Sequence, residues 1–290
     1  RDSGFVLGWV GLARAFERAR TWQFPVPGVP RDSVLARLVA AAERANELDS
    51  TNAEVWIMRA RVSEALDPTS RGPGIRYLRR ALAIDSMDAD AWQILGLSLE
   101  ESFDRAGALA ALNRAVAVQP GHTEALTFLA LHYFWARQYD TAAVWADSVV
   151  AVDPTLVVAR YAAGTVAIER GRRSEAEAQL QACNRLATSA DVQCLTGLAR
   201  LAARTGDPAA ARDYLAQALA RTDSISPSVH GAVYLACAYA TLGDPDRALS
   251  WLTRYSPRRD MHFQMHMRYE PALDALRSDP RLQALRTETR

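Results

Sequence analysis

A spacing of about 34 residues recurs along most of this sequence, and it restricts the fold more than any other feature. In the clearest instance, large apolar residues, small residues and a closing proline stand at fixed positions, namely Trp92, Leu95, Gly96, Leu99, Ala108, Leu112, Ala115 and Pro120. One period later the same order returns at Leu126, Leu129, Ala130, Tyr133, Ala142, Ala146, Val149 and Pro154. A fixed period of this length predicts an array of helix-turn-helix units that stack on one another.

The period extends in both directions with weaker matches. Downstream, Gly-Asp-Pro triplets begin at Gly206 and Gly243; glycine can end a helix in the left-handed conformation, and proline fits the first turn of the next helix. Upstream, units begin around Trp56 and Trp9, and the first contains a proline-rich insertion from Trp22 to Pro30. We therefore predict seven helical pairs, at about residues 1–50, 53–86, 89–122, 123–156, 157–190, 192–226 and 229–255.

The last part of the chain breaks the period. Pro257, Pro271 and Pro280 bound short helical stretches there, and an array needs an atypical terminal segment to cover the apolar face of its last unit. The predicted fold class is all-α: a right-handed superhelical solenoid over residues 1–255, followed by a helical cap over residues 256–290.

The motif residues from about Phe5 to Tyr255 resemble the tetratricopeptide repeat,. Two segments carry a closer resemblance, Ala41-Ala42-Glu43-Arg44-Ala45 with Leu48-Asp49, and the tail from Pro271 to Arg281. They are similar to C-terminal arrays of bacterial serine/threonine kinases, adenylate-cyclase-like proteins and membrane-linked transcriptional regulators. No kinase, cyclase or DNA-binding module accompanies the array in this sequence. The resemblance therefore implies a sensing or docking region that binds proteins or peptides, and it transfers no catalytic residues.

Charge and composition exclude several classes of function. The 34 basic residues, all arginine, nearly cancel the 33 acidic ones, so the basic footprint of a nucleic-acid-binding domain is missing. No stretch approaches the roughly 18 consecutive apolar residues of a membrane-crossing helix, and we expect no membrane insertion. No phosphate-binding loop, nucleophile elbow or zinc-protease motif occurs. We predict that the chain is not an enzyme and needs no cofactor.

The candidate partner-binding residues follow from the repeat. In such arrays the first helix of each pair lines a concave surface, and its second, fifth, ninth, twelfth and thirteenth positions face a bound partner. The residues assigned to this surface are Arg14, Arg18, Arg61, Gln93, Glu101, Phe134, Trp135, Tyr161, Arg200 and Arg204.

Phe134 and Trp135 are the most specific members of this set. Large aromatic side chains in a groove rimmed by charge are frequent binding anchors. Packing against a neighbouring helix explains them equally well. The charged members are weaker evidence, because a solvated helix face needs no partner.

Cys183 and Cys194 belong to adjacent helices, and we expect them to lie close together while Cys237 stays unpaired. A disulfide between them would place the protein in an exported or periplasmic bacterial compartment, and reduced thiols would place it in the cytoplasm. Because the chain begins with Arg1, we expect a processed product or a piece of a longer protein, which leaves the localisation open.

The stretch from Met261 to Met267 combines thioether and imidazole side chains at helical spacing, which suits copper(I),. Methionine also fills irregular gaps in a core. Since the stretch falls where a cap must cover apolar surface, packing is the preferred interpretation and no metal site is assigned.

Two functions remain in view. The first is a scaffold that binds a protein or peptide on its concave face, as a bacterial signalling or assembly module. The alternative is a structural subunit that associates with copies of itself, because contacts that do not close build larger assemblies.

Overall fold

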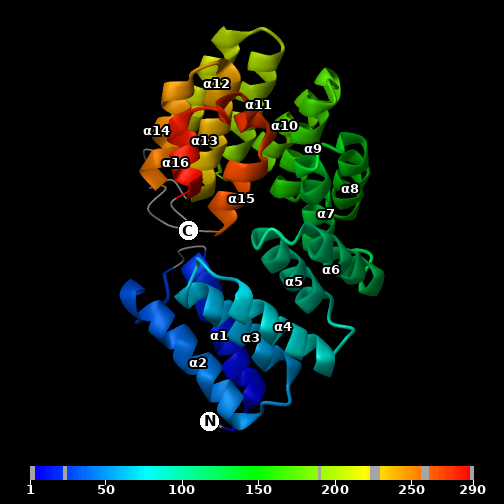
Figure 1. The fold of residues 1–290 in the computed structure, drawn as a ribbon, viewed down its shortest axis with the longest axis vertical. Helices are drawn as coiled ribbons and strands as arrows, with labels where there is room; N and C mark the ends of the chain where they lie inside the picture. The colour runs from blue at the N-terminus through cyan, green and yellow to red at the C-terminus, as the bar shows by residue number, and fades with distance from the viewer. Residues whose placement is uncertain (1–3, 22–24, 189–190, 223–228, 256–260, 288–290) are drawn as a thin grey trace. The chain divides into compact units, whose positions relative to one another are not determined.

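The structure is a computed structural model that describes residues 4–21, 25–188, 191–222, 229–255 and 261–287 (Figure 1). It divides into two compact units, which we call unit 1 (Arg1–Pro120) and unit 2 (Gly121–Arg290). No β-strand occurs in the part of the chain that is described, where extended pairing is limited to an isolated bridge between Val26 and Val29. The predicted all-α solenoid of helix pairs is confirmed.

Unit 1 consists of three antiparallel helix pairs. Its helices are α1 (Val6–Thr21), the short 3-10 helix η1 (Arg31–Ser33), α2 (Val34–Leu48), α3 (Ala53–Leu66), α4 (Gly72–Ile84), α5 (Ala89–Glu101) and α6 (Arg105–Val118). Each first helix packs on its own partner, and α3 and α5 also pack on the second helix of the preceding pair. Leu38, Val55 and Leu78 lie fully buried in the shared core.

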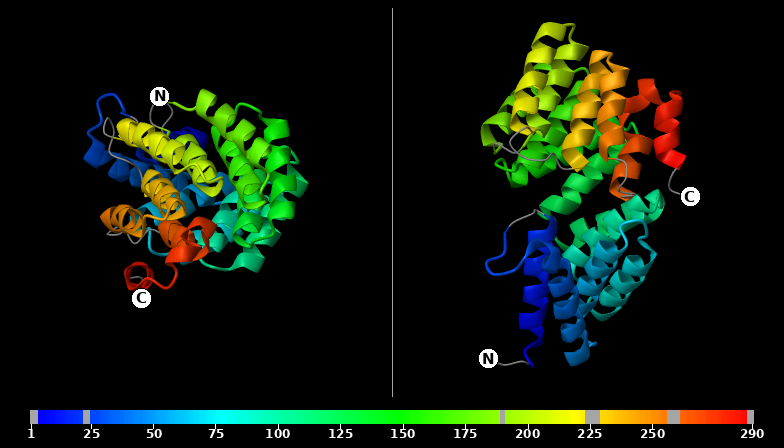
Figure 2. Two further views of the ribbon diagram at one scale, coloured as in Figure 1. Left: turned by 90° about the horizontal axis from the view of Figure 1, so that it is seen from above. Right: turned by 90° about the vertical axis from the view of Figure 1, so that its left-hand side faces the viewer.

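Unit 2 contains four helix pairs and a C-terminal segment, drawn from two further sides in Figure 2. They are α7 (Thr123–Trp135), α8 (Tyr139–Val152), α9 (Val157–Glu169), α10 (Arg173–Leu186), α11 (Gln193–Arg204), α12 (Pro208–Thr222), α13 (Val229–Leu242) and α14 (Pro245–Tyr255). The C-terminal part forms α15 (Met261–Tyr269), η2 (Pro271–Leu276) and α16 (Pro280–Thr287).

Small residues let the two helices of a pair approach closely. A Cβ atom added to Gly96 would lie 2.7 Å from Leu112 Cγ, and one added to Gly164 would lie 2.6 Å from Leu180 Cγ. Such distances are shorter than any van der Waals contact, and both leucines are buried. Any larger residue at these two crossings would therefore have to displace the leucine of the partner helix.

From α5 onward, the turns between the first and second helix of a pair share one backbone conformation. Phe103, Arg137, Gly171, Gly206 and Gly243 all have positive φ, between 63° and 85°. In each case the next residue donates its N–H to the carbonyl five residues earlier, at 2.9 Å, which satisfies an orphan carbonyl at the helix end. Left-handed backbone favours glycine, so Phe103 and Arg137 are exceptions.

The ends of α2, α3 and α8 are each followed by an aspartate turn. Asp153 follows α8, and its carboxylate accepts hydrogen bonds from the N–H and the hydroxyl of Thr155 at 2.8 and 2.7 Å. Asp49 and Asp67 make the same pair of bonds with the threonine two residues later. These bonds lower the pKa of all three aspartates, the hydroxyl contributing most,.

The C-terminal segment reaches further than a terminal cap. Its α16 contacts α14 and its η2 contacts α13, as a cap would. However, Met265 of α15 lies in one buried cluster with Phe134 and Trp135 of α7 and with Val166 of α9. The segment therefore covers first helices across unit 2 in addition to the last pair.

Candidate protein-interaction surface

The first helices of successive pairs lie beside one another, as α1 does with α3 and α9 with α11. We call the side that they form together the inner face of each unit. It carries the positions that the repeat assigns to partner binding. The inner faces of the two units differ in what covers them.

The inner face of unit 1 presents charged side chains. Arg14 pairs with Glu54 at 2.6 Å, and Arg61 lies 3.8 Å from Glu64. Arg18 is exposed, and no carboxylate among the described residues pairs with it. One guanidinium on this face is thus available to an anionic group of a partner.

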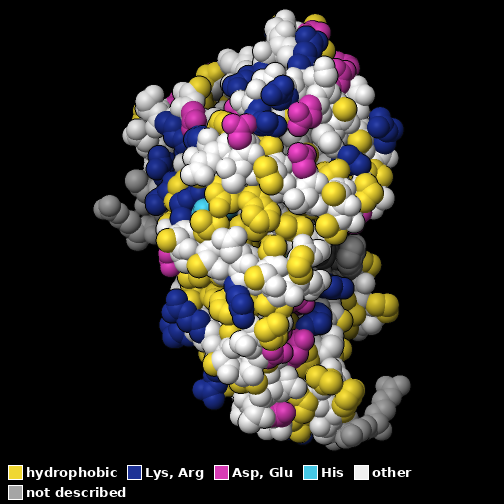
Figure 3. All heavy atoms as spheres, turned by 90° about the vertical axis from the view of Figure 1, so that its right-hand side faces the viewer, with side chains coloured by type: hydrophobic (Ala, Val, Ile, Leu, Met, Phe, Trp, Pro, Cys, Tyr) yellow, Lys and Arg dark blue, Asp and Glu magenta, His cyan; other side chains and the backbone are white. Residues whose placement is uncertain are grey.

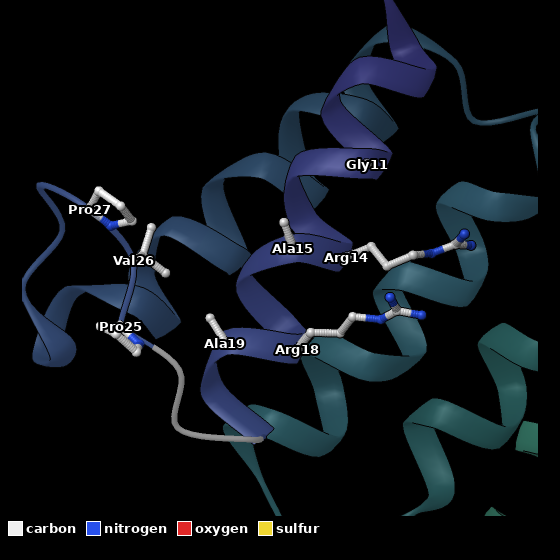
Figure 4. Close-up of a pocket in the computed structure, with 8 residues that line it drawn as sticks. All are labelled: Gly11, Arg14, Ala15, Arg18, Ala19, Pro25, Val26 and Pro27. Atoms are coloured by element: carbon white, nitrogen blue, oxygen red, sulfur yellow. The ribbon is translucent and has the colours of Figure 1, made fainter. Parts of the chain in front are cut away.

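A hollow of about 430 Å³ lies along α1 next to these arginines (Figure 4). Gly11, Ala15 and Ala19 lie between its two sides. The stems of Arg14 and Arg18 extend to one side of α1, and the Pro25–Val26–Pro27 segment stands on the other.

Two residues assigned to the exposed surface of unit 1 are buried instead. Glu101 is 5% exposed and forms an ion pair and hydrogen bond with Arg71, so its charge is neutralised inside the protein. Gln93 on the same helix is also buried. The assignment of these two as accessible contact residues is therefore corrected.

A second acidic residue completes this buried network. Ser98 donates a hydrogen bond to Glu64 at 2.7 Å. Burial raises the pKa of Glu64, although the charges of Arg61 and Arg71 and the serine hydrogen bond act in the opposite direction,. The charged groups of this network therefore stabilise the packing of neighbouring helix pairs and are not exposed for contact with a ligand.

In unit 2 the predicted aromatic anchors are buried. Phe134 and Trp135 are 3% and 4% exposed, and Tyr161 is also buried. The Trp135 ring meets His266 of α15 edge to face, with 5.5 Å between centroids. The expectation of aromatic anchors standing open in a groove is thus wrong in this structure, and packing accounts for them. The C-terminal segment packs with Phe134 and Trp135, whereas Tyr161 packs against Tyr234 of α13, with 5.0 Å between ring centroids.

Arg200 joins the same covered region. It is 2% exposed, lies 3.3 Å from Glu169 and 3.7 Å from Glu270, and is therefore buried rather than an accessible groove residue. Arg204 remains half-exposed and shares Glu169 at 3.1 Å. Burial acts to raise the pKa of Glu270, but the neighbouring His266, whose Nδ1 lies 3.7 Å away, and the charge of Arg200 outweigh it, and the pKa is lowered,.

Arg137 is the contact residue that the repeat pattern missed. Its guanidinium donates to the Tyr269 carbonyl at 2.7 Å and to Asp274 at 2.8 and 2.9 Å. The signal was present in the sequence, because glycine stands one and two periods later, at Gly171 and Gly206. A non-glycine residue in a left-handed turn calls for a reason.

Cys183 and Cys194 are joined by a disulfide, with their Cα atoms 5.6 Å apart, and Cys237 is free and buried. In the Met261–Met267 stretch, Met265 and Met267 are buried apolar residues, while the side chain of His262 lies outside the described residues. Within the described residues, no group of three or more His, Cys, Asp or Glu side chains could hold a metal ion.

Charge on the surface is mixed. Acidic and basic side chains are interspersed with hydrophobic ones on the face drawn in Figure 3. None of the described helices combines the length and the apolar character needed to cross a membrane.

Solved structures with the same arrangement decide the fold. No protein-family model matches the sequence, and no curated protein matches it either. A tetratricopeptide repeat protein from Parabacteroides merdae is similar over 96% of this chain and 98% of its own, with a TM-score of 0.59 and 16% identity. This chain has the tetratricopeptide-repeat fold.

Two further solved structures, PilW and PilF, share the arrangement. PilW, described as a widely conserved type IV pilus biogenesis factor, matches 74% of this chain and 96% of its own, with a TM-score of 0.59 and 18% identity. PilF of Pseudomonas aeruginosa matches 77% and 96%, with a TM-score of 0.56 and 16% identity. Identities this low establish the fold alone.

Proposed function

We propose that this protein is a non-catalytic scaffold that binds a protein or peptide partner on the inner face of unit 1. The observation that carries the proposal is the exposed Arg18 beside the apolar hollow of α1. A guanidinium next to an apolar floor suits a segment with a carboxylate close to an apolar side chain. On the inner face of unit 2 the corresponding groups are already engaged.

The comparisons support a scaffold in a bacterial assembly or signalling system. The fold is shared with a type IV pilus biogenesis factor, and the sequence resembles arrays attached to bacterial kinases and cyclases. A role in assembling or regulating a larger complex is consistent with both. Export to an oxidising compartment is part of the same proposal, because the Cys183–Cys194 disulfide persists there and rarely in the cytoplasm,.

Binding is tested by capture with the purified full chain, followed by titration of the retained partner. Arg18→Glu should weaken its affinity by about tenfold or more, since a lost charge-assisted contact becomes a repulsion. Arg37→Glu is the matched control, because Arg37 is an exposed arginine on the neighbouring helix α2. Equal affinity of the two variants would remove unit 1 as the binding surface.

Self-association is the second candidate, and one observation favours it. One repeat position of the first helices is fully buried in later pairs, at Val55, Ala91, Ala159 and Cys194. The same position in α1 is Gly8, which is exposed. Leu7 and Leu12 on the same helix are 53% and 41% exposed, and Phe5 just before it is 55% exposed. An apolar helix face of this kind is a candidate contact between copies.

Sedimentation of the full chain over a range of concentrations separates the two functions. If copies associate through α1, Leu12→Glu should abolish a concentration-dependent dimer. Val144→Glu should not, although Val144 is a still more exposed apolar residue on α8. A chain that stays monomeric throughout excludes the second candidate.

A further inference from the structure

We infer that residues 261–277 are a built-in ligand of the inner face of unit 2, and that this face binds a partner segment of the same chemistry when the built-in segment leaves. The partner segment is a short apolar helix followed by a carboxylate. The inference goes beyond the proposed function, because it concerns the other unit and a different set of side chains.

The apolar part of the recognition comes from one short helix. Phe263, Met265 and Met267 of α15 are fully buried. Met265 packs with Trp135 of α7 and Val166 of α9. Side chains of α15 thus occupy the place on the first helices where the repeat predicts a bound peptide.

The charged part is more specific than a cap requires. A cap has only to cover apolar surface, yet Glu270 brings a buried carboxylate to within 3.7 Å of the buried Arg200. Arg200 also contacts Glu169 on the neighbouring helix. Buried ion pairs add little net stability but discriminate strongly between partners. The inner face of unit 2 is therefore built to recognise a carboxylate.

The backbone at Arg137 supports the same conclusion. Arg137 has a φ of 63° where Gly171, Gly206 and Gly243 stand in the equivalent turns. A non-glycine residue in this conformation costs about 1 kcal/mol or more. In this conformation the Arg137 guanidinium contacts the Tyr269 carbonyl and the Asp274 carboxylate. The turn is thus adapted to hold the segment.

The segment can leave because it has little structure of its own. Its α15 has nine residues, and isolated helices shorter than about 12 residues are marginal in water. The Arg137–Asp274 pair is 35% and 52% exposed and so adds little stability. A segment that folds only when bound must compete for its surface with any similar segment of a partner. The apparent affinity for that partner rises with the fraction of time in which the built-in segment is detached.

The test uses the full chain and a fluorescent synthetic peptide with the sequence of residues 261–277. Met265→Asp in the chain weakens the built-in segment and leaves the surface itself unchanged. We expect this variant to bind the peptide about tenfold or more tightly than the wild-type chain does. Ser278→Asp is the matched control, because it places the same new charge at an exposed position just beyond the segment, and it should leave the affinity unchanged.

Two further arms make the result decisive. A peptide carrying Glu270→Lys should lose binding, since the carboxylate is the specific element. Arg18→Glu in unit 1 should leave peptide binding unaltered, which separates this inference from the function proposed above. If the Met265→Asp variant forms a dimer and the peptide dissociates that dimer, this result would also support binding between separate molecules.

The opposite results are equally clear. If Met265→Asp shows faster amide exchange in α15 but no gain in peptide affinity, the face accepts no ligand in trans and the inference is wrong. Asp274→Asn is the milder variant if Met265→Asp does not fold. Unfolding of unit 2 in both variants would show that the segment is integral core, and it would equally overturn the inference.

Discussion

The guanidinium of Arg137 donates hydrogen bonds to both carboxylate oxygens of Asp274, across 137 residues of chain. This pair joins the first turn of unit 2 to the 3-10 helix η2 near its end. It is also the contact for which the α7–α8 turn keeps a non-glycine residue at positive φ.

Arg137→Gly should be more stable than Arg137→Ala by about 1 kcal/mol, because both lose the guanidinium but only alanine keeps the left-handed strain. Denaturant unfolding measures the difference. Arg170 provides the control, since its φ is −78° and the glycine variant should have no advantage there. If the glycine variant were more stable than the alanine variant at both Arg137 and Arg170, backbone strain at Arg137 would be contradicted.

Gly164→Ala should destabilise the protein by about 1 to 3 kcal/mol, because the added Cβ would overlap the buried Leu180,. Gly11→Ala should instead stabilise it by up to about 1 kcal/mol, since nothing lies within 4 Å of that Cβ and alanine is the better helix former. Denaturation midpoints that move in the same direction would show that the crossing of α9 and α10 is looser than described.

The Cys183–Cys194 disulfide closes a loop of 11 residues and should contribute about 3 kcal/mol by the chain-entropy estimate. A reductant should therefore lower the melting temperature of the wild-type chain and leave Cys183→Ser unaffected. Cys237→Ser keeps the dependence on reductant and serves as the control. Free thiols at both positions in protein from its native compartment would contradict the disulfide.

Asp153 should titrate below its ordinary value of 3.8, because Thr155 stabilises the carboxylate. The stabilisation is present above pH 3.8 and is lost as the pH falls through the lower folded value,. Thr155→Val should raise the pKa of Asp153 and leave that of Asp49 unchanged, which carbon NMR of the carboxylates measures directly. A shift at both aspartates would point to a general electrostatic change.

The helix pairs were predictable because their determinants are local. Gly96 and Gly164 stand where two helices cross, and the 34-residue spacing carries that geometry from pair to pair. The proximity of Cys183 and Cys194 followed for the same reason, since neighbouring helices of adjacent pairs must lie side by side.

The covering of unit 2 was not predictable in this way. The repeat correctly places Arg200 and the aromatic Trp135 on first helices, but nothing in a 34-residue period says what lies over them. That depends on residues such as Met265, more than 60 positions later in sequence and outside the period. The sequence signal for this long-range contact is Arg137, which stands where later repeats have glycine.

The separation of Arg137 from Asp274 has a consequence for synthesis. Ribosomes add about 5 to 20 residues per second, so the 137 residues between the two partners take about 7 to 27 seconds to make. Helices form within microseconds, so α7 and α9 have time to fold long before α15 exists. Each new molecule therefore passes through a period in which Trp135 and Arg200 are uncovered, and a chaperone or partner present at the ribosome meets them first.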